Sequence, residues 1–217
     1  MQYYEYLLKM LPEDEPVEFG DSVHSTIATK ISYEWIRKGT DKLIETTASR
    51  TRMNLLSSLS LETMNVTIWS YEMLDSSTME EHFKKLHENY PKAAKIHLIL
   101  DRGSYNTSPQ TQKAAEKYSI VLPYLPPHNP PLNPIERFWK GMNERVRNKR
   151  YFHSLQQFKL AVMVFFDKTW DKIVPSMVDR INDNFQILKQ ASSSRLGLYN
   201  EKNKGLVSSH RSYYLSV

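Results

Sequence analysis

The chain of 217 residues contains no cysteine, which excludes disulfides, thiolate zinc sites and cysteine nucleophiles. Its six glycines form no phosphate-binding loop, so a reaction driven by nucleotide hydrolysis is not indicated. A run of about 18 apolar residues is missing, and the chain does not start with the basic and then apolar pattern of a secretory signal. We therefore expect a protein of the reducing cytoplasm.

Positive charge is only mildly in excess, with 29 Lys and Arg against 24 Asp and Glu and a net charge of +5 at pH 7. The excess is concentrated between residues 132 and 150, which contain two glutamates and six basic residues. The basic residues are Arg137, Lys140, Arg145, Arg147, Lys149 and Arg150. Such a cluster is either a solvated helix face or a surface for an acidic partner such as nucleic acid.

Hydrophobic periodicity predicts an α/β fold in which antiparallel strands come first and strands alternating with helices follow. The expected strands are 17–21, 31–38, 42–47, 52–62, 66–73, 96–101 and 120–125, with a hairpin turn at 39–41. The expected helices are 76–90, with Ser77 and Thr78 as caps, 109–118, 132–146 and 155–178. This order indicates a mixed sheet flanked by helices in one domain, residues 1–192, followed by a poorly ordered tail, residues 193–217.

Three acidic residues occupy special places in this order. Asp21 ends the first strand, Asp101 ends the most buried strand, and Glu136 lies in the first turn of the helix after a proline-rich segment. Strand ends meet at one edge of such a sheet, so Asp21 and Asp101 face each other if the two strands are neighbours. The three carboxylates converge if the helix that carries Glu136 closes the third side. Converging carboxylates repel one another unless cations are present, and Mg²⁺ prefers oxygen ligands. A pair of such ions can cleave a phosphodiester.

Each acid also has a purely structural interpretation. Asp21 and Asp101 can be turn formers, because Asp is common where strands end. The segment Asn133-Pro134-Ile135-Glu136 has the pattern of a helix capping box. Spacing alone does not decide between these interpretations and a metal site.

The three acids stand in the segments FGDSVH (19–24), LILD (98–101) and LPPHNPPLNPIERFW (125–139). In this order the segments resemble those of the insertion sequence six-thirty family of bacterial transposases, part of the mariner-like DDE superfamily. The most specific is the segment 125–139, which is similar to the family's LPPYSPxLNPIExxW with its third catalytic acid. The segments LILD (98–101) with YNTS (105–108), and FGDSVH (19–24), resemble those of the second and first acids. Thirty-four residues separate Asp101 from Glu136, as in this superfamily.

The resemblance implies a ribonuclease-H-like DDE catalytic core whose Asp21, Asp101 and Glu136 hold two Mg²⁺ or Mn²⁺ ions. It implies cutting at terminal inverted repeats, strand transfer by the 3′-hydroxyl into target DNA, and a location at the bacterial nucleoid. The N-terminal domain with which such proteins recognise DNA is not expected in this chain. Six residues are candidates for DNA contact, and Trp139 is expected in the core. The candidates are Arg137, Lys140, Arg145, Arg147, Trp35 and Arg37.

The sequence also departs from the family pattern at His128, Asn129, Ser25 and Glu34. These departures leave open a catalytically inactive, transposase-derived DNA-binding or regulatory protein. A ribonuclease-H-like nuclease without strand transfer would share the three acids. A homodimer assembled through the helix 155–178 is a further possibility.

Overall fold

The computed structural model describes residues 9–29, 37–39, 43, 45–46, 49, 51–126, 133–148 and 150–181. All of them belong to one compact unit, Met1–Asp183. Most of the predicted hairpin, the segment 127–132 and the predicted tail lie outside these residues. The turn expected at 39–41 is described only at Gly39, whose φ of +82° is a backbone conformation that favours glycine.

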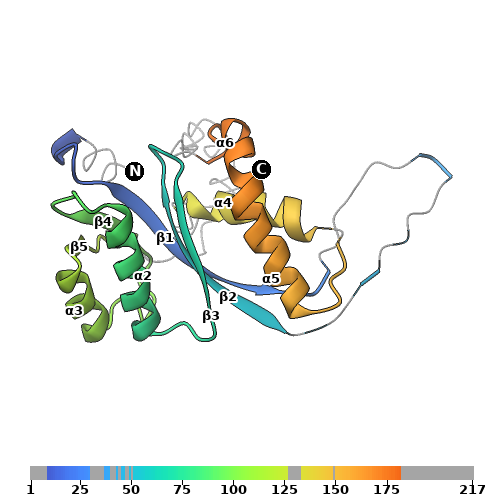
Figure 1. Cartoon of the computed structure of the whole chain (residues 1–217), viewed down its shortest axis with the longest axis horizontal. Coiled ribbons are helices and arrows are strands. Elements are labelled where there is room, and N and C mark those ends of the chain that lie inside the picture. The colour runs from blue at the N-terminus through green and yellow to red at the C-terminus, as the bar shows by residue number, and fades with distance from the viewer. Residues whose placement is uncertain are drawn as a thin grey trace, which may run out of the picture. The chain divides into compact units, whose positions relative to one another are not determined.

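A five-stranded mixed sheet forms the centre of this unit (Figure 1). Its strand order is β3-β2-β1-β4-β5, with β1–β2 and β2–β3 antiparallel and β1–β4 and β4–β5 parallel. The strands are β1 (Val17–Thr26), β2 (Arg52–Ser60), β3 (Val66–Tyr71), β4 (Ile96–Ile99) and β5 (Ile120–Val121). The mixed sheet expected from the sequence is thereby confirmed.

Helices cover both faces of this sheet, with α2 and α3 on one side and α4, α5 and α6 on the other (Figure 1). The helices are α2 (Ser76–Asn89), α3 (Pro109–Lys117), α4 (Ile135–Met142), α5 (Leu155–Val164) and α6 (Trp170–Met177). Wide π-helical turns, η2 (Asn143–Arg147) and η3 (Phe165–Thr169), follow α4 and α5. None of the helices described is long and apolar enough to cross a membrane.

Alternating side chains of the strands fill two separate cores. Phe19 on β1 packs in one cluster with Phe138 of α4 and Phe158 of α5. Leu98 on β4 and Leu100, just after β4, belong to the second cluster, with residues of α2 and α3. All five side chains are at most 2% exposed. Burying each stabilises the fold by about 1.5–3 kcal/mol, so the two cores hold the sheet edge that carries the acids in place.

The first strand is longer than predicted, and Asp21 lies within it. Antiparallel pairing with β2 continues to Thr26, opposite Arg52, whereas parallel pairing with β4 ends at Phe19, opposite Ile99. The local sequence predicted a break at Asp21 because Asp is common at strand ends. That prediction was wrong: Asp21 marks the place where β1 loses β4 as its neighbour.

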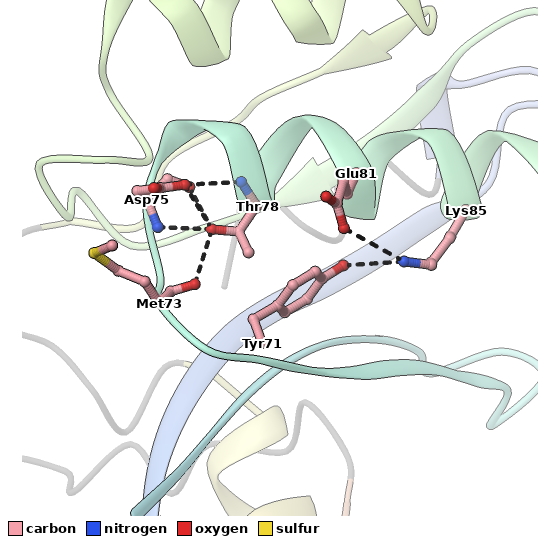
Figure 2. A network of polar contacts seen from close by, with 6 residues as sticks. All are labelled: Tyr71, Met73, Asp75, Thr78, Glu81 and Lys85. Atoms are coloured by element: carbon pink, nitrogen blue, oxygen red, sulfur yellow. Dashed lines mark hydrogen bonds and ion pairs between the residues drawn. The ribbon is translucent and has the colours of Figure 1, made fainter.

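The cap of α2 is Asp75, and not Ser77 or Thr78 as predicted (Figure 2). Oδ1 of Asp75 accepts hydrogen bonds from the backbone N–H groups of Ser77 and Thr78, both at 2.9 Å. The Thr78 hydroxyl accepts in return from the Asp75 N–H at 2.7 Å. Thr78 is therefore the third residue of the helix and completes a capping box with Asp75, which lies two residues before Ser77, the first of the predicted caps.

Candidate active site

The Asp21 carboxylate accepts a hydrogen bond from a side chain of α4. The donor is Nε1 of Trp139, 3.0 Å from Asp21 Oδ2. Trp139 is only 3% exposed, in agreement with its predicted place in the core. The sequence did not indicate its bond to the acid, because an aromatic residue at helical spacing signals burial and gives no sign of where its N–H points.

Asp101 follows β4 directly and is held by its own loop. Its Oδ1 accepts from Nδ2 of Asn106 at 2.6 Å and from the backbone N–H of Gly103 at 3.0 Å. The β1–β4 register ends with Phe19 opposite Ile99, so Asp21 and Asp101 both lie two residues beyond the last pair. The Ser22 and Tyr105 hydroxyls, 2.5 Å apart, connect β1 to this loop.

Glu136 is presented by the first turn of α4 and is accessible to solvent. The predicted capping box is only half formed in the described residues. Oδ1 of Asn133 accepts from the Ile135 N–H at 3.3 Å, but no bond from the Asn133 N–H to the Glu136 side chain is found there. Asn133 is buried, and its Nδ2 donates to the carbonyl of Gly20 at 3.2 Å. The Asn133 and Trp139 bonds together fix α4 against β1 on both sides of Glu136.

The charges of these acids act on one another. The pKa of Asp21 is raised to about 7, first by burial, then by the Glu136 charge and less strongly by that of Asp101, while the hydrogen bonds from Ser22 and Trp139 act in the opposite direction. Partial burial and then the Asp101 charge raise the pKa of Glu136. The structure thus gathers Asp21, Asp101 and Glu136 into one region of unfavourable negative charge.

No ion pair found among the described residues includes one of the three acids. The ion pairs found there are Lys85–Glu81, His97–Glu15, Lys117–Glu80 and Arg180–Glu144. The possible metal ligands are the carboxylate oxygens of the three acids, and such oxygens suit a hard divalent cation. No three acidic or histidine side chains of the described part are grouped closely enough to hold an ion as they stand. The residue types and charge fit a metal, and the acids must draw closer to bind it.

The basic residues predicted to contact DNA have different surroundings. Lys140 on α4 is exposed, and Arg37 beside Gly39 is exposed as well. Arg137 and Arg145 are partly buried. Arg147 is engaged within the protein, because its Nη2 donates to Thr26 Oγ1 at 2.6 Å. Trp35 lies outside the described residues.

Asn106, Trp139 and Tyr105 are site residues whose contacts the sequence did not indicate. Asn106 and Tyr105 lie in the segment that resembles the family's second-acid motif, which was the available signal. The pattern did not indicate that Asn106 would bond Asp101 or that Tyr105 would reach Ser22, because both contacts depend on the loop's path.

The strand order, the helices on both faces and the acids on β1, after β4 and on α4 define a ribonuclease-H-like fold. A family model described as DDE superfamily endonuclease matches residues 16–159, more than half of the chain. The chain belongs to this family.

Two curated relatives from bacteria are similar in sequence. An uncharacterized 39 kDa protein of insertion element IS630 from Shigella sonnei is 25% identical over 157 residues, which are 71% of this chain and 45% of that protein. The uncharacterized protein y4pE/y4sA of Sinorhizobium fredii is 28% identical over 100 residues, 46% of this chain and 69% of that protein. The chain therefore spans under half the length of the first of these relatives.

Solved structures of a mariner transposase share the fold. The catalytic domain of Mos1 has a TM-score of 0.57 at 10% identity, covering 82% of this chain and 85% of that domain. A Mos1 paired end complex with Mn has a TM-score of 0.60 at 11% identity, covering 82% of this chain and 57% of that chain. At such identity these likenesses concern the fold.

Proposed function

We propose that this chain is the catalytic domain of a DNA transposase, which cleaves DNA at the ends of a mobile element and joins the freed 3′-hydroxyl to target DNA. The observation that carries the proposal is the mutual repulsion of Asp21, Asp101 and Glu136, none of which takes part in an ion pair found among the described residues. Membership in the DDE endonuclease family supports it.

Asp21, Asp101 and Glu136 would hold two divalent cations, Mg²⁺ or Mn²⁺. Bound there, such ions activate a water or 3′-hydroxyl and stabilise the leaving oxygen of a phosphodiester. The chain itself supplies the orientation of the acids: Trp139 holds Asp21, and Asn106 with the Gly103 N–H holds Asp101. Neutral donors leave the negative charge of both carboxylates available to a cation.

DNA would lie over α4 and η2, where the basic residues follow Glu136. Lys140 and Arg145 would contact phosphates, which fixes the position of the backbone without reading sequence. Arg137 remains a candidate for the same role, as do Arg37 and Trp35 on the segment after β1. Arg147 contributes by fixing η2 to the end of β1 at Thr26.

Nicking of a supercoiled plasmid in Mn²⁺ tests the metal assignment. We expect Asp101→Asn to lower the rate by roughly 1,000-fold, because removing a metal-binding carboxylate forfeits several kcal/mol of transition-state stabilisation. Asp171→Asn, at an exposed acid of α6, is the control and should nick at the normal rate. Equal activity of the two variants would reject the assignment.

Strand transfer separates a transposase from a simple nuclease with the same acids. A labelled duplex with a recessed, free 3′-hydroxyl is incubated with plasmid and Mn²⁺. A transposase joins the label covalently to the plasmid, and the joining requires Asp101. Nicking without any joined product would assign the chain to the nucleases.

A further inference from the structure

We infer that Trp139 is a positioning residue, which holds the Asp21 carboxylate in the orientation that binds a divalent cation. The inference rests on the function proposed above and adds a residue to that site. Its basis is the 3.0 Å hydrogen bond from Trp139 Nε1 to Asp21 Oδ2. The indole is buried, so it would act on the cation only through Asp21.

Packing fixes the direction of this N–H. The Trp139 side chain is 3% exposed, and its ring lies against Phe138 with 4.8 Å between the ring centroids. An indole N–H donates and cannot accept, so it neither takes up a proton from the site nor competes for the metal. The bond therefore orients one carboxylate oxygen and leaves the charge of Asp21 in place.

The position of Trp139 on α4 also couples two of the acids. It follows Glu136 by three residues, so both side chains lie on the same side of the helix. One helix thus presents Glu136 to the site and holds Asp21 on β1. Asn106 orients Asp101 in the same way, because its Nδ2 donates to Asp101 Oδ1 at 2.6 Å. Both aspartates are consequently fixed by a buried, neutral side-chain donor.

The Trp139→Phe variant removes the donor and keeps an aromatic ring. Trp170→Phe is a matched control, because Trp170 is 4% exposed, packs on the same Phe138, and donates its Nε1 at 3.0 Å to the Met64 carbonyl, away from the acids. Mn²⁺ is titrated into the whole chain, and the free ion is measured by electron paramagnetic resonance. Near-ultraviolet circular dichroism verifies that both variants are folded.

We expect Trp139→Phe to weaken Mn²⁺ binding by roughly 10–100-fold, as loss of a bond to a metal ligand does, and Trp170→Phe to change it less than about twofold. Equal effects of the two variants would show that Trp139 acts only as a core residue, which would overturn the inference. The proposed metal site would not be affected by that result. Unchanged Mn²⁺ binding in Asp21→Asn would instead reject the metal site itself, and with it the inference.

Discussion

His82 is a fully buried residue of α2, and both of its ring nitrogens lack a hydrogen-bond partner among the described residues. Burial, and to a lesser degree the charge of Lys85, lowers its pKa from 6.5 to about 3. The unfolded chain therefore takes up this proton near pH 6.5, and the folded chain does not until about pH 3. The stability that His82 contributes is complete above pH 6.5 and is lost as the pH falls from 6.5 towards 3.

The lowered pKa of His82 predicts that the folded protein loses stability as the pH falls. Between pH 7.5 and pH 5 the free energy of unfolding should fall by about 2 kcal/mol from His82 alone. His82→Leu cannot take up the proton, so its decrease should be smaller by that amount. Urea denaturation of both proteins at the two pH values measures the difference. An identical decrease in the variant would show that His82 titrates freely in the fold.

Gly20 is the residue at which the sheet leaves no room for a side chain. A Cβ at this position would lie 2.5 Å from Leu100 Cδ2 and 3.1 Å from Leu98 Cδ1, in the core under α2 and α3. At Gly141 a Cβ would meet only the flexible end of Met177. The two glycines therefore differ in how easily their neighbours can move.

Gly20→Ala should accordingly destabilise the protein by about 1–3 kcal/mol, as overpacking of a core does. We expect a smaller loss for Gly141→Ala, because the Met177 side chain can turn aside. Urea denaturation midpoints of the two variants provide the comparison. A larger loss at Gly141 would place the tight packing between α4 and α6 instead of between β1 and β4.

Among the elements, α2 shows how a helix start is decided by hydrogen bonds that propensity alone does not predict. Asp75, Ser77 and Thr78 are all good capping residues, and the structure uses Asp75 (Figure 2). The two backbone bonds to its carboxylate lower the pKa of Asp75, together with the bond from the Thr78 hydroxyl.

Asp75→Ala should cost about 1 kcal/mol of stability, and Ser77→Ala close to nothing. The reason is that Asp75, and not Ser77, accepts the hydrogen bonds from backbone N–H groups in the first turn of α2 that are found among the described residues. Thermal unfolding of both variants distinguishes the two caps. A larger loss in Ser77→Ala would return the cap to a residue expected from the sequence.

The α4–η2 segment combines the third acid with the basic cluster. If Lys140 contacts a phosphate, Lys140→Ala should lower the slope of log K against log salt concentration by about 0.9 for a duplex of arbitrary sequence. Lys113, exposed on α3 across the sheet, provides the control variant Lys113→Ala. Fluorescence anisotropy at several salt concentrations measures both. Equal slopes for the two variants would place DNA elsewhere on the molecule.

At the scale of the whole molecule, periodicity in the sequence was enough to predict the mixed sheet and its helices. Strand β4 is a short apolar run and α3 begins at a proline, and both lie where the pattern placed them. The end of β1 was missed because it is set by pairing with β2, which is distant in sequence. The π-helical turns after α4 and α5 leave no periodic signal of their own.

The sequence predicts which acids form the candidate site, but it does not predict the side chains that orient them. Asp101 and Glu136 stand in recognisable motifs, so their residue types and spacing suggested a cation. The donors Trp139 and Asn106 act through side-chain directions that arise only when α4 and the loop after β4 are folded against β1 and β4. Such directions are properties of tertiary structure.

The central claim is that Asp21, Asp101 and Glu136 together bind the divalent cations that cleave DNA. Anomalous diffraction from crystals soaked in Mn²⁺ tests it most directly, because it places the ion without reference to activity. Our account predicts Mn²⁺ within about 2.5 Å of carboxylate oxygens from all three residues, after a closing movement that draws the acids together. Mn²⁺ bound elsewhere, with these three carboxylates still apart, would contradict it.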